Sequence, residues 1–212
     1  MRYRNREDAG RVLAAHLIAY AGRQDVSVLG LPRGGVPVAA QIASELPAPL
    51  DAFLVRKLGV PGFEELAMGA VAEGGIVVLN PDVVRSLDIP QSSIDRVAER
   101  EELELGRRAV VYRGSRGRPD VAGRIVILVD DGLATGATME AGVVALRQLN
   151  PSRIVVAAPV GARETCTRLA GIADEVVCPL QPEAFDAVGL WYEDFRQTGD
   201  EEVRAILGKV TL

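Results

Sequence analysis

Short, mainly apolar runs alternate along this chain with segments of helical periodicity. The clearest runs are Val26–Leu31, Ile125–Val129 and Ile154–Ala158, and a segment with apolar residues at helical spacing follows each of them. A strand that lacks polar positions must be buried on both faces, and the helices between such strands supply the cover. This alternation predicts an α/β protein with a doubly wound, mainly parallel sheet.

The remaining segments fit the same architecture, apart from one region without a regular pattern. The length of 212 residues fits a single domain over residues 1–212. Residues 57–66 contain Gly59, Pro61 and Gly62, which predicts a mobile loop. Further elements are expected as helices at 6–22, 36–46, 91–112, 139–149 and 163–170, strands at 50–55 and 175–177, and a hairpin of 67–72 with 76–79.

Composition and charge exclude several classes of function. The net charge is −5, from 24 Lys and Arg against 29 Asp and Glu, which leaves room only for a local basic patch. Cys166 and Cys178 form neither a disulfide framework nor a zinc pattern, so we expect buried, reduced thiols. No apolar run approaches the roughly 20 residues of a membrane helix, and the charged N-terminus lacks the apolar stretch of a secretory signal. We expect a cytoplasmic protein that binds neither membrane nor nucleic acid.

The strand–loop–helix unit at 127–139, ILVDDGLATGATM, is the most informative part of the chain. Its buried strand ends in Asp130 and Asp131, at the sheet edge where open α/β proteins bind ligands. Two threonine hydroxyls flank Gly136, and the backbone N–H groups of the helix start attract an anion. Because carboxylates accept hydrogen bonds from vicinal hydroxyls, this arrangement predicts a ribose 5-phosphate site. The plainer interpretation is an Asp-Asp-Gly turn with Thr138 as a helix cap.

This run resembles the motif with which type I phosphoribosyltransferases bind 5-phosphoribosyl 1-pyrophosphate (PRPP). The order of apolar strand residues, two acids, Gly-Leu and Ala-Thr-Gly-x-Thr is highly specific. Ala137 stands where many members carry glycine, and its backbone N–H is retained. The resemblance implies a small hood above the sheet, a flexible β-hairpin loop, and Asp130 and Asp131 on the ribose hydroxyls. It implies that the 5-phosphate is held by Ala134, Thr135, Gly136, Ala137 and Thr138.

The resemblance covers most of the chain. We take roughly 24–180 as the core and expect the hood in 1–23 and 181–212, with a contribution from 80–112 also open. The chain is also similar to one bacterial branch of the family, for which the resemblance supplies no acceptor base. This second similarity rests on residues 55–59, 69–75 and 191–195.

A second anion site is expected after the first strand. Arg33, Gly34 and Gly35 follow that strand and precede a helix with Pro37 in its first turn. Glycines there allow a row of exposed N–H donors, although a bare Gly-Gly loop is most often only a turn. Beside the first motif, this loop resembles the family's pyrophosphate loop, which often contains a cis non-proline peptide.

Arg56 and Lys57 end the next strand at the same sheet edge. They are either a solvated pair or the charges that neutralise pyrophosphate. In the family a basic residue here starts the flexible catalytic loop, and 58–68 has a suitable length and Gly/Pro content. Closure of such a loop would exclude water from a reactive sugar cation.

The implied reaction is attack of a nitrogenous base, or another nucleophile, on C1 of PRPP with release of pyrophosphate. Asp130 and Asp131 would offset positive charge on the ribose, and Arg33, Arg56, Lys57 and Mg²⁺ would stabilise the departing pyrophosphate. Mg²⁺ is expected mainly through PRPP, with water-mediated contacts to the two acids, so no dedicated metal ligands are assigned. A homodimer is also expected.

The acceptor base is less constrained. Ala134 stands where members that use 6-oxopurines commonly carry an Asp for the N7 proton, which argues against hypoxanthine and guanine. Trp191 and Tyr192 belong to the chain's one aromatic cluster and are either packed or a stacking platform for the base. The alternative function is a non-catalytic sensor of PRPP or nucleotides on the same fold.

Overall fold

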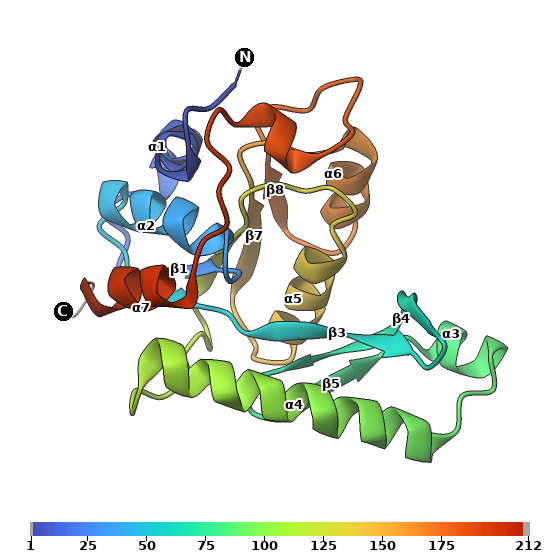
Figure 1. Ribbon diagram of the computed structural model, residues 1–212. Coiled ribbons are helices and arrows are strands. Elements are labelled where there is room, and N and C mark those ends of the chain that lie inside the picture. Colours follow the sequence, from blue (N-terminus) through green and yellow to red (C-terminus); the bar gives the residue numbers. More distant parts are fainter. Residues whose placement is uncertain (1, 210–212) are drawn as a thin grey trace.

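The computed structural model describes residues 2–209 and contains two sheets (Figure 1). The larger sheet is entirely parallel, with the strand order β2-β1-β6-β7-β8. Every residue of its two central strands is buried, as the apolar runs predicted. The strands are β1 (Val26–Gly30), β2 (Leu50–Ala52), β6 (Ile125–Val129), β7 (Arg153–Ala157) and β8 (Glu175–Val177).

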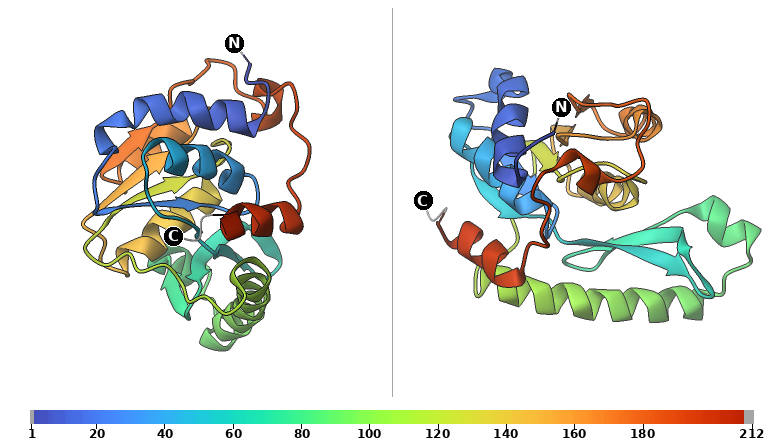
Figure 2. Two further views of the ribbon diagram at one scale, coloured as in Figure 1. Left: turned by 90° about the vertical axis from the view of Figure 1, so that its left-hand side faces the viewer. Right: turned by 45° about the horizontal axis from the view of Figure 1, so that its top comes forward.

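Helices cover both faces of this sheet. Figures 1 and 2 show α1 (Arg6–His16) and α2 (Gly35–Glu45) on one side, with α5 (Ala137–Arg147) and α6 (Arg163–Ala170) on the other. The doubly wound fold is thereby confirmed. The first helix was predicted over 6–22 and ends at His16. A short 3-10 helix at Ile18–Tyr20 follows it.

Residues 57–66, which Gly59, Pro61 and Gly62 predicted to be a mobile loop, lie in the second sheet, and the β-hairpin that the family resemblance implied is present there. These residues belong to an antiparallel hairpin whose turn lies at Pro61 and Gly62, where Gly62 adopts the left-handed φ of +82°. Leu58 and Met68 are fully buried because the hairpin packs on α4 and α5. The elements are β3 (Val55–Val60), β4 (Phe63–Ala72), β5 (Ile76–Leu79), α3 (Pro81–Ser86) and α4 (Gln91–Arg113).

The expected single strand at 50–55 is divided between the two sheets. The chain leaves the parallel sheet after β2 and joins the hairpin at Val55. Arg113, at the end of α4, secures this crossing: its side chain is 1% exposed and donates to Asp51 at 2.8 Å, to Glu73 and to the carbonyl of Ala52. The hydrophobic periodicity of residues 50–55 could not predict the division of this strand, because the division depends on Arg113, which is distant in the sequence.

The N-terminal residues of the chain meet the segment at 191–194 above the parallel sheet. The backbone of Tyr3 bonds to that of Trp191 and Glu193, and the Tyr3 hydroxyl donates to the carbonyl of Pro159 at 2.9 Å. We call residues 2–23 and 181–199 the hood. The 3-10 helix η2 (Val188–Trp191) lies in it, and α7 (Asp200–Lys209) continues toward α2 and α4 (Figure 1). Between residues 2 and 209, no helix is long and apolar enough to cross a membrane.

Candidate functional site

Asp130 and Asp131 lie side by side at the carboxyl end of β6. The backbone N–H of Asp131 donates to Asp130 Oδ1 at 2.9 Å. Burial, and secondarily the neighbouring Asp131 carboxylate, raise the pKa of Asp130 well above its usual value. Burial also raises the pKa of Asp131, and the nearby Arg6 guanidinium opposes that rise. The pair is therefore a site of concentrated negative charge that favours partners able to donate hydrogen bonds or supply positive charge.

The Arg33–Gly35 loop approaches this pair closely. A Cβ on Gly34 would overlap Asp131 Oδ2, and one on Gly35 would lie 2.5 Å from the carbonyl oxygen of Val129. Both positions therefore require glycine. The peptide bond between Pro32 and Arg33 is cis, as the family resemblance led us to expect. The structure thus brings together the two loops that the sequence singled out.

The 134–138 loop connects the acids to α5. Gly136 has a φ of +71°, and a Cβ there would overlap Thr165. The Thr165 hydroxyl donates to the carbonyl of Ala134 at 2.6 Å, and Arg168 donates to the carbonyl of Thr135. These bonds occupy carbonyl groups of the loop. The N–H of Ala137 donates to the Thr135 hydroxyl oxygen at 3.5 Å, at the start of α5, where an anion is favoured.

Arg56 and Lys57 do not point to one place, contrary to the expectation that they act together. Successive strand residues face opposite sides of a sheet. Arg56 is therefore directed to α4, where it donates to Glu101. Lys57 faces α5, and its Nζ lies 3.2 Å from the carbonyl oxygen of Glu65.

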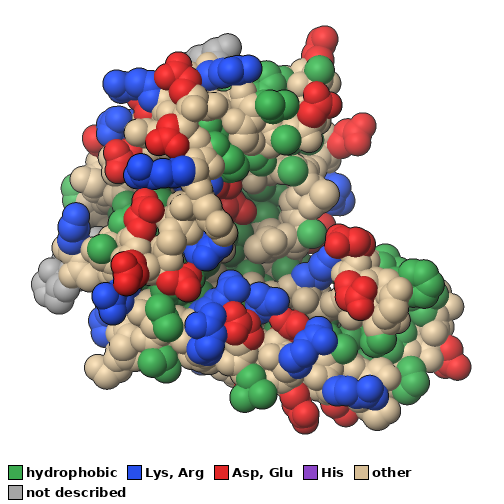
Figure 3. Space-filling model, in the orientation of Figure 1, with side chains coloured by type: hydrophobic (Ala, Val, Ile, Leu, Met, Phe, Trp, Pro, Cys, Tyr) green, Lys and Arg blue, Asp and Glu red, His purple; other side chains and the backbone are tan. Residues whose placement is uncertain are grey.

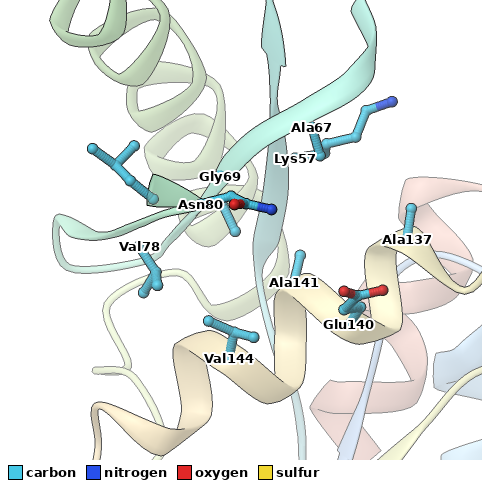
Figure 4. Close-up of a pocket in the computed structure, with 11 residues that line it drawn as sticks. Lys57, Ala67, Gly69, Val78, Asn80, Ala137, Glu140, Ala141 and Val144 are labelled. Carbon is cyan, nitrogen blue, oxygen red and sulfur yellow. The ribbon is translucent and has the colours of Figure 1, made fainter. Parts of the chain in front are cut away.

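A cavity of about 290 Å³ lies between the hairpin and α5 (Figure 4). Lys57 and Asn80 line it from the hairpin side, opposite the first two turns of α5. Ala137, at the end of the 134–138 loop, lines it as well. The cavity therefore adjoins the loop, whereas Asp130 and Asp131 are not among its lining residues.

Arg33 is already paired. Its Nη1 lies 3.8 Å from Asp200 Oδ1 at the start of α7, and the same carboxylate accepts a hydrogen bond from the Tyr112 hydroxyl at 2.7 Å. The long separation and partial exposure make this a weak ion pair that an anion could displace. Figure 3 shows that this face of the molecule is hollowed between the hood and the hairpin sheet, with acidic side chains inside the hollow.

The two aromatic residues proposed for base stacking have different environments. Tyr192 is 4% exposed, and its ring centroid lies 5.7 Å from that of Tyr3 and 4.9 Å from that of Phe195. Its hydroxyl donates to the backbone carbonyl of Asp131 at 2.5 Å. The ring of Tyr192 is thus packed, which is the first of the two alternatives that the sequence left open. Trp191 is partly exposed, and its buried Nε1 has no hydrogen-bond partner.

Sequence reasoning missed Arg6, which forms the most direct contact with the acidic pair. Its Nε donates to Asp131 Oδ2 at 2.7 Å, although 125 positions separate the two residues. Arg6 is one of several arginines in the first 11 residues, so nothing in the local sequence distinguishes this one. Only the docking of α1 beside the loops shows its role.

The donor set suits a hard cation held mainly by its substrate. Among residues 2–209, no group of three or more His, Cys, Asp or Glu side chains could hold a metal ion. Asp130 and Asp131 supply two carboxylates, and Mg²⁺ commonly binds through one or two carboxylates together with substrate phosphates and water. The site therefore fits Mg²⁺ that arrives with a phosphorylated ligand.

Comparison with known proteins agrees with this geometry. The family model described as "Phosphoribosyl transferase domain" matches residues 2–190. A Mycobacterium tuberculosis protein (strain H37Rv), named "Putative phosphoribosyl transferase Rv0571c", is 49% identical over 97% of this chain and 46% of its own length. This chain thus spans about half the length of that curated relative.

Two further similarities differ in extent. The "Bifunctional protein PyrR" of Roseiflexus sp. is 28% identical over 68% of this chain and 61% of its own length. The crystal structure of TT1426 from Thermus thermophilus is 47% identical and covers 99% of both chains, with a TM-score of 0.91. The whole described fold, hood and hairpin included, therefore has a close structural counterpart.

Proposed function

The chain belongs to the phosphoribosyl transferase family, and on that premise we propose that it transfers the 5-phosphoribosyl group of PRPP to a nitrogenous base. The bond between C1 and the pyrophosphate oxygen breaks, and a bond between C1 and the base nitrogen forms. Pyrophosphate leaves with the electron pair of the broken bond. The non-catalytic alternative is a PRPP or nucleotide sensor that uses the same site.

One observation carries this proposal. The Arg33–Gly35 loop lies so close to Asp131 that only glycine fits at position 34, and the 134–138 loop begins from the same acidic pair. Two anion-binding loops on either side of carboxylates match a ligand with phosphate at both ends of a sugar diol. PRPP is such a ligand.

The residues have separable tasks in the proposed reaction. Thr135, Thr138 and the amides at the start of α5 hold the 5-phosphate, while Asp130 and Asp131 accept hydrogen bonds from the ribose hydroxyls. The same carboxylates offset positive charge as the C1 bond breaks. Arg33 turns from Asp200 to the pyrophosphate. Lys57 is the second cation of the site, and Arg56 supports the hairpin through Glu101.

Mg²⁺, when bound, neutralises pyrophosphate charge and so makes it a better leaving group. Asp130 and Asp131 are the residues that would hold its water shell. Their raised pKa values fit this assignment, because a nearby cation favours the ionised form of a carboxylate.

The acceptor is proposed to be a base other than a 6-oxopurine. Ala134 is exposed and offers no carboxylate for an N7 proton. A positioned acid or base typically contributes about 10²–10⁴-fold in rate, so hypoxanthine, guanine and xanthine should be poor acceptors. Adenine or an unorthodox base, held by main-chain groups and the Trp191 face, fits better.

The test is pyrophosphate release with Mg²⁺ and PRPP in the presence of adenine, hypoxanthine, guanine, xanthine, uracil or orotate. We expect turnover with one acceptor class and its loss in an Asp130→Asn/Asp131→Asn variant. Asp82→Asn is the matched control, because that carboxylate is exposed and pairs only with Arg85 on α3. PRPP binding without turnover on any base would favour the sensor, and the absence of PRPP binding would contradict both.

A further inference from the structure

Arg6 is unusually well held for an arginine in the first turn of a surface helix. Its side chain is only 12% exposed, and its Nη1 donates to the carbonyl oxygen of Arg196 at 2.7 Å. The guanidinium carbon lies 4.0 Å from the ring centroid of Phe195. Planar stacking together with several directed hydrogen bonds is a combination that a guanidinium provides and an ammonium does not.

The remaining contact of Arg6 is with the acidic pair. Its Nε donates to Asp131 Oδ2 at 2.7 Å, and that carboxylate is 15% exposed. The same Nε lies 3.1 Å from where a Cβ on Gly34 would be. One guanidinium therefore joins the N-terminal hood segment, the C-terminal hood segment and the meeting point of the two site loops.

The contact between Arg6 and Asp131 matters because few other positive charges face this carboxylate. The groups that face it are Arg6 from α1 and Asp130 from its own loop, while the Tyr192 hydroxyl bonds to its backbone carbonyl. Burial and the second acid both disfavour a charged pair, whereas Arg6 favours the ionised form of Asp131. Arg33, the nearest cation of the neighbouring loop, is paired with Asp200.

We propose that Arg6 is a positioning residue of the PRPP site, which orients the Asp131 carboxylate toward the ribose hydroxyls and makes that orientation depend on the two hood segments that hold Arg6. This inference rests on the proposed function and deepens it. Arg6 acts through Asp131. The hood therefore contributes to PRPP binding before any base is present.

The first experiment measures the affinity for Mg²⁺–PRPP by calorimetry at neutral pH. Arg6→Gln should weaken binding about tenfold or more, as expected for loss of a charge-assisted hydrogen bond.

Two variants separate charge and position from a general loss of packing. Arg6→Lys keeps the positive charge but loses the planar fork of donors, so it should recover the affinity only in part. Arg11→Gln removes an exposed arginine from the same helix, whose contacts are Asp8 and Gln41, and should leave the affinity unchanged. Circular dichroism and thermal melting establish that each variant is folded.

The second experiment places Arg6→Gln in an Asp131→Asn background. If Arg6 acts through Asp131, its removal should change PRPP affinity less than about twofold there, because coupled residues are strongly non-additive. An equal loss in both backgrounds would overturn the inference.

Failure of the inference and failure of the proposed function give different results. A wild-type protein that binds Mg²⁺–PRPP, with an Arg6→Gln variant of equal affinity, overturns the role of Arg6 alone. A wild-type protein that binds no Mg²⁺–PRPP overturns the proposed function and this inference with it.

Discussion

At the scale of residues, the two carboxylates at the end of β6 lower the stability of the fold and favour the binding of a ligand. Asp130 is half-buried beside a second carboxylate, and desolvation and that second charge both raise its pKa. A folded-state pKa above the unfolded value means that the native state binds more protons in the window between the two values. The free energy of unfolding should therefore fall as pH rises from about 4, the ordinary aspartate value, to the raised value.

Asp130→Asn tests directly how much the charged Asp130 carboxylate lowers the free energy of unfolding. The amide keeps an oxygen that can accept the hydrogen bond from the Asp131 N–H. At neutral pH the variant should be more stable than wild type by about 1 kcal/mol or more, the scale of a buried polar group without compensation. Urea unfolding of both proteins at mildly acidic and mildly alkaline pH measures this difference in the free energy of unfolding. Parallel pH dependence in the two proteins would contradict the prediction, and PRPP affinity should fall despite the gain in stability.

Gly34→Ala tests the close approach of the two loops. Gly34 has a φ of −64°, which any residue can adopt, so the substitution introduces only the overlap with Asp131 Oδ2. We expect PRPP affinity to fall at least about tenfold, because displacement of one group in a preorganised site is costly. Gly117→Ala is the control, since nothing lies within 4 Å of a Cβ there. Equal binding by both variants would show that the loops are not close in solution.

At the scale of elements, the hairpin sheet depends on α4 for its attachment. Arg113 ties the end of α4 to Asp51, near the last residue of β2, and to Glu73, between β4 and β5. A second tie, from Arg56 to Glu101, lies further along the same helix. The hairpin is therefore anchored at its base, whereas residues 63–66 near its tip are exposed.

Arg113→Met should be strongly destabilising. It leaves two carboxylates and a carbonyl oxygen without their buried partner, and breaking a buried ion pair typically costs about 3–5 kcal/mol. Chemical denaturation measures the loss. Arg85→Met provides the comparison, because Arg85 is exposed on α3 and its pairing with Asp82 should contribute little. A decrease in the free energy of unfolding of less than about 1 kcal/mol for Arg113→Met would show that Arg113 is not the main attachment of the hairpin sheet.

The hairpin tip is the remaining candidate for a mobile lid. Hydrogen exchange should be faster in 61–66 than in 68–72, because the former are exposed and the latter mostly buried. Addition of Mg²⁺–PRPP with a base analogue should slow exchange at the tip. Equal and full protection of both stretches in the free protein would exclude the lid.

At the scale of the whole molecule, α4 presents an apolar surface that the described chain does not cover. Leu103 is 78% exposed and Val110 is 67% exposed, and a spacing of seven residues places them on one face of the helix. This surface agrees with the sequence prediction of a homodimer, which remains a prediction for a single chain. Contact with a second copy would remove these two side chains from water, which is a favourable contribution to association.

Light scattering with size-exclusion chromatography tests the homodimer. The wild type should have twice the mass of one chain, and Leu103→Glu/Val110→Glu should shift it toward the monomer, because two charges would be buried at the contact. Leu190→Glu is the control, since Leu190 is 52% exposed in the hood, on a different element. A monomeric wild type would contradict the prediction.

The sequence by itself determined the parallel sheet, the two site loops and the family, because each depends on local information. Ile125–Val129 must be buried on both faces, and the glycines and acids that surround a phosphate lie within a few positions of one another. The order of elements then brings the two loops to the same sheet edge, without further knowledge of packing.

Only the tertiary structure decided how distant segments meet. Arg6 reaches Asp131 across 125 positions, Tyr192 packs between Tyr3 and Phe195, and Arg56 and Lys57 separate to opposite faces once β3 pairs with β4. The expected loop at 57–66 became a hairpin for the same reason, because α4 and α5 bury side chains that look exposed in isolation. These features arise from contacts between residues that are distant in the sequence. The secondary-structure propensity of a local segment does not determine such contacts.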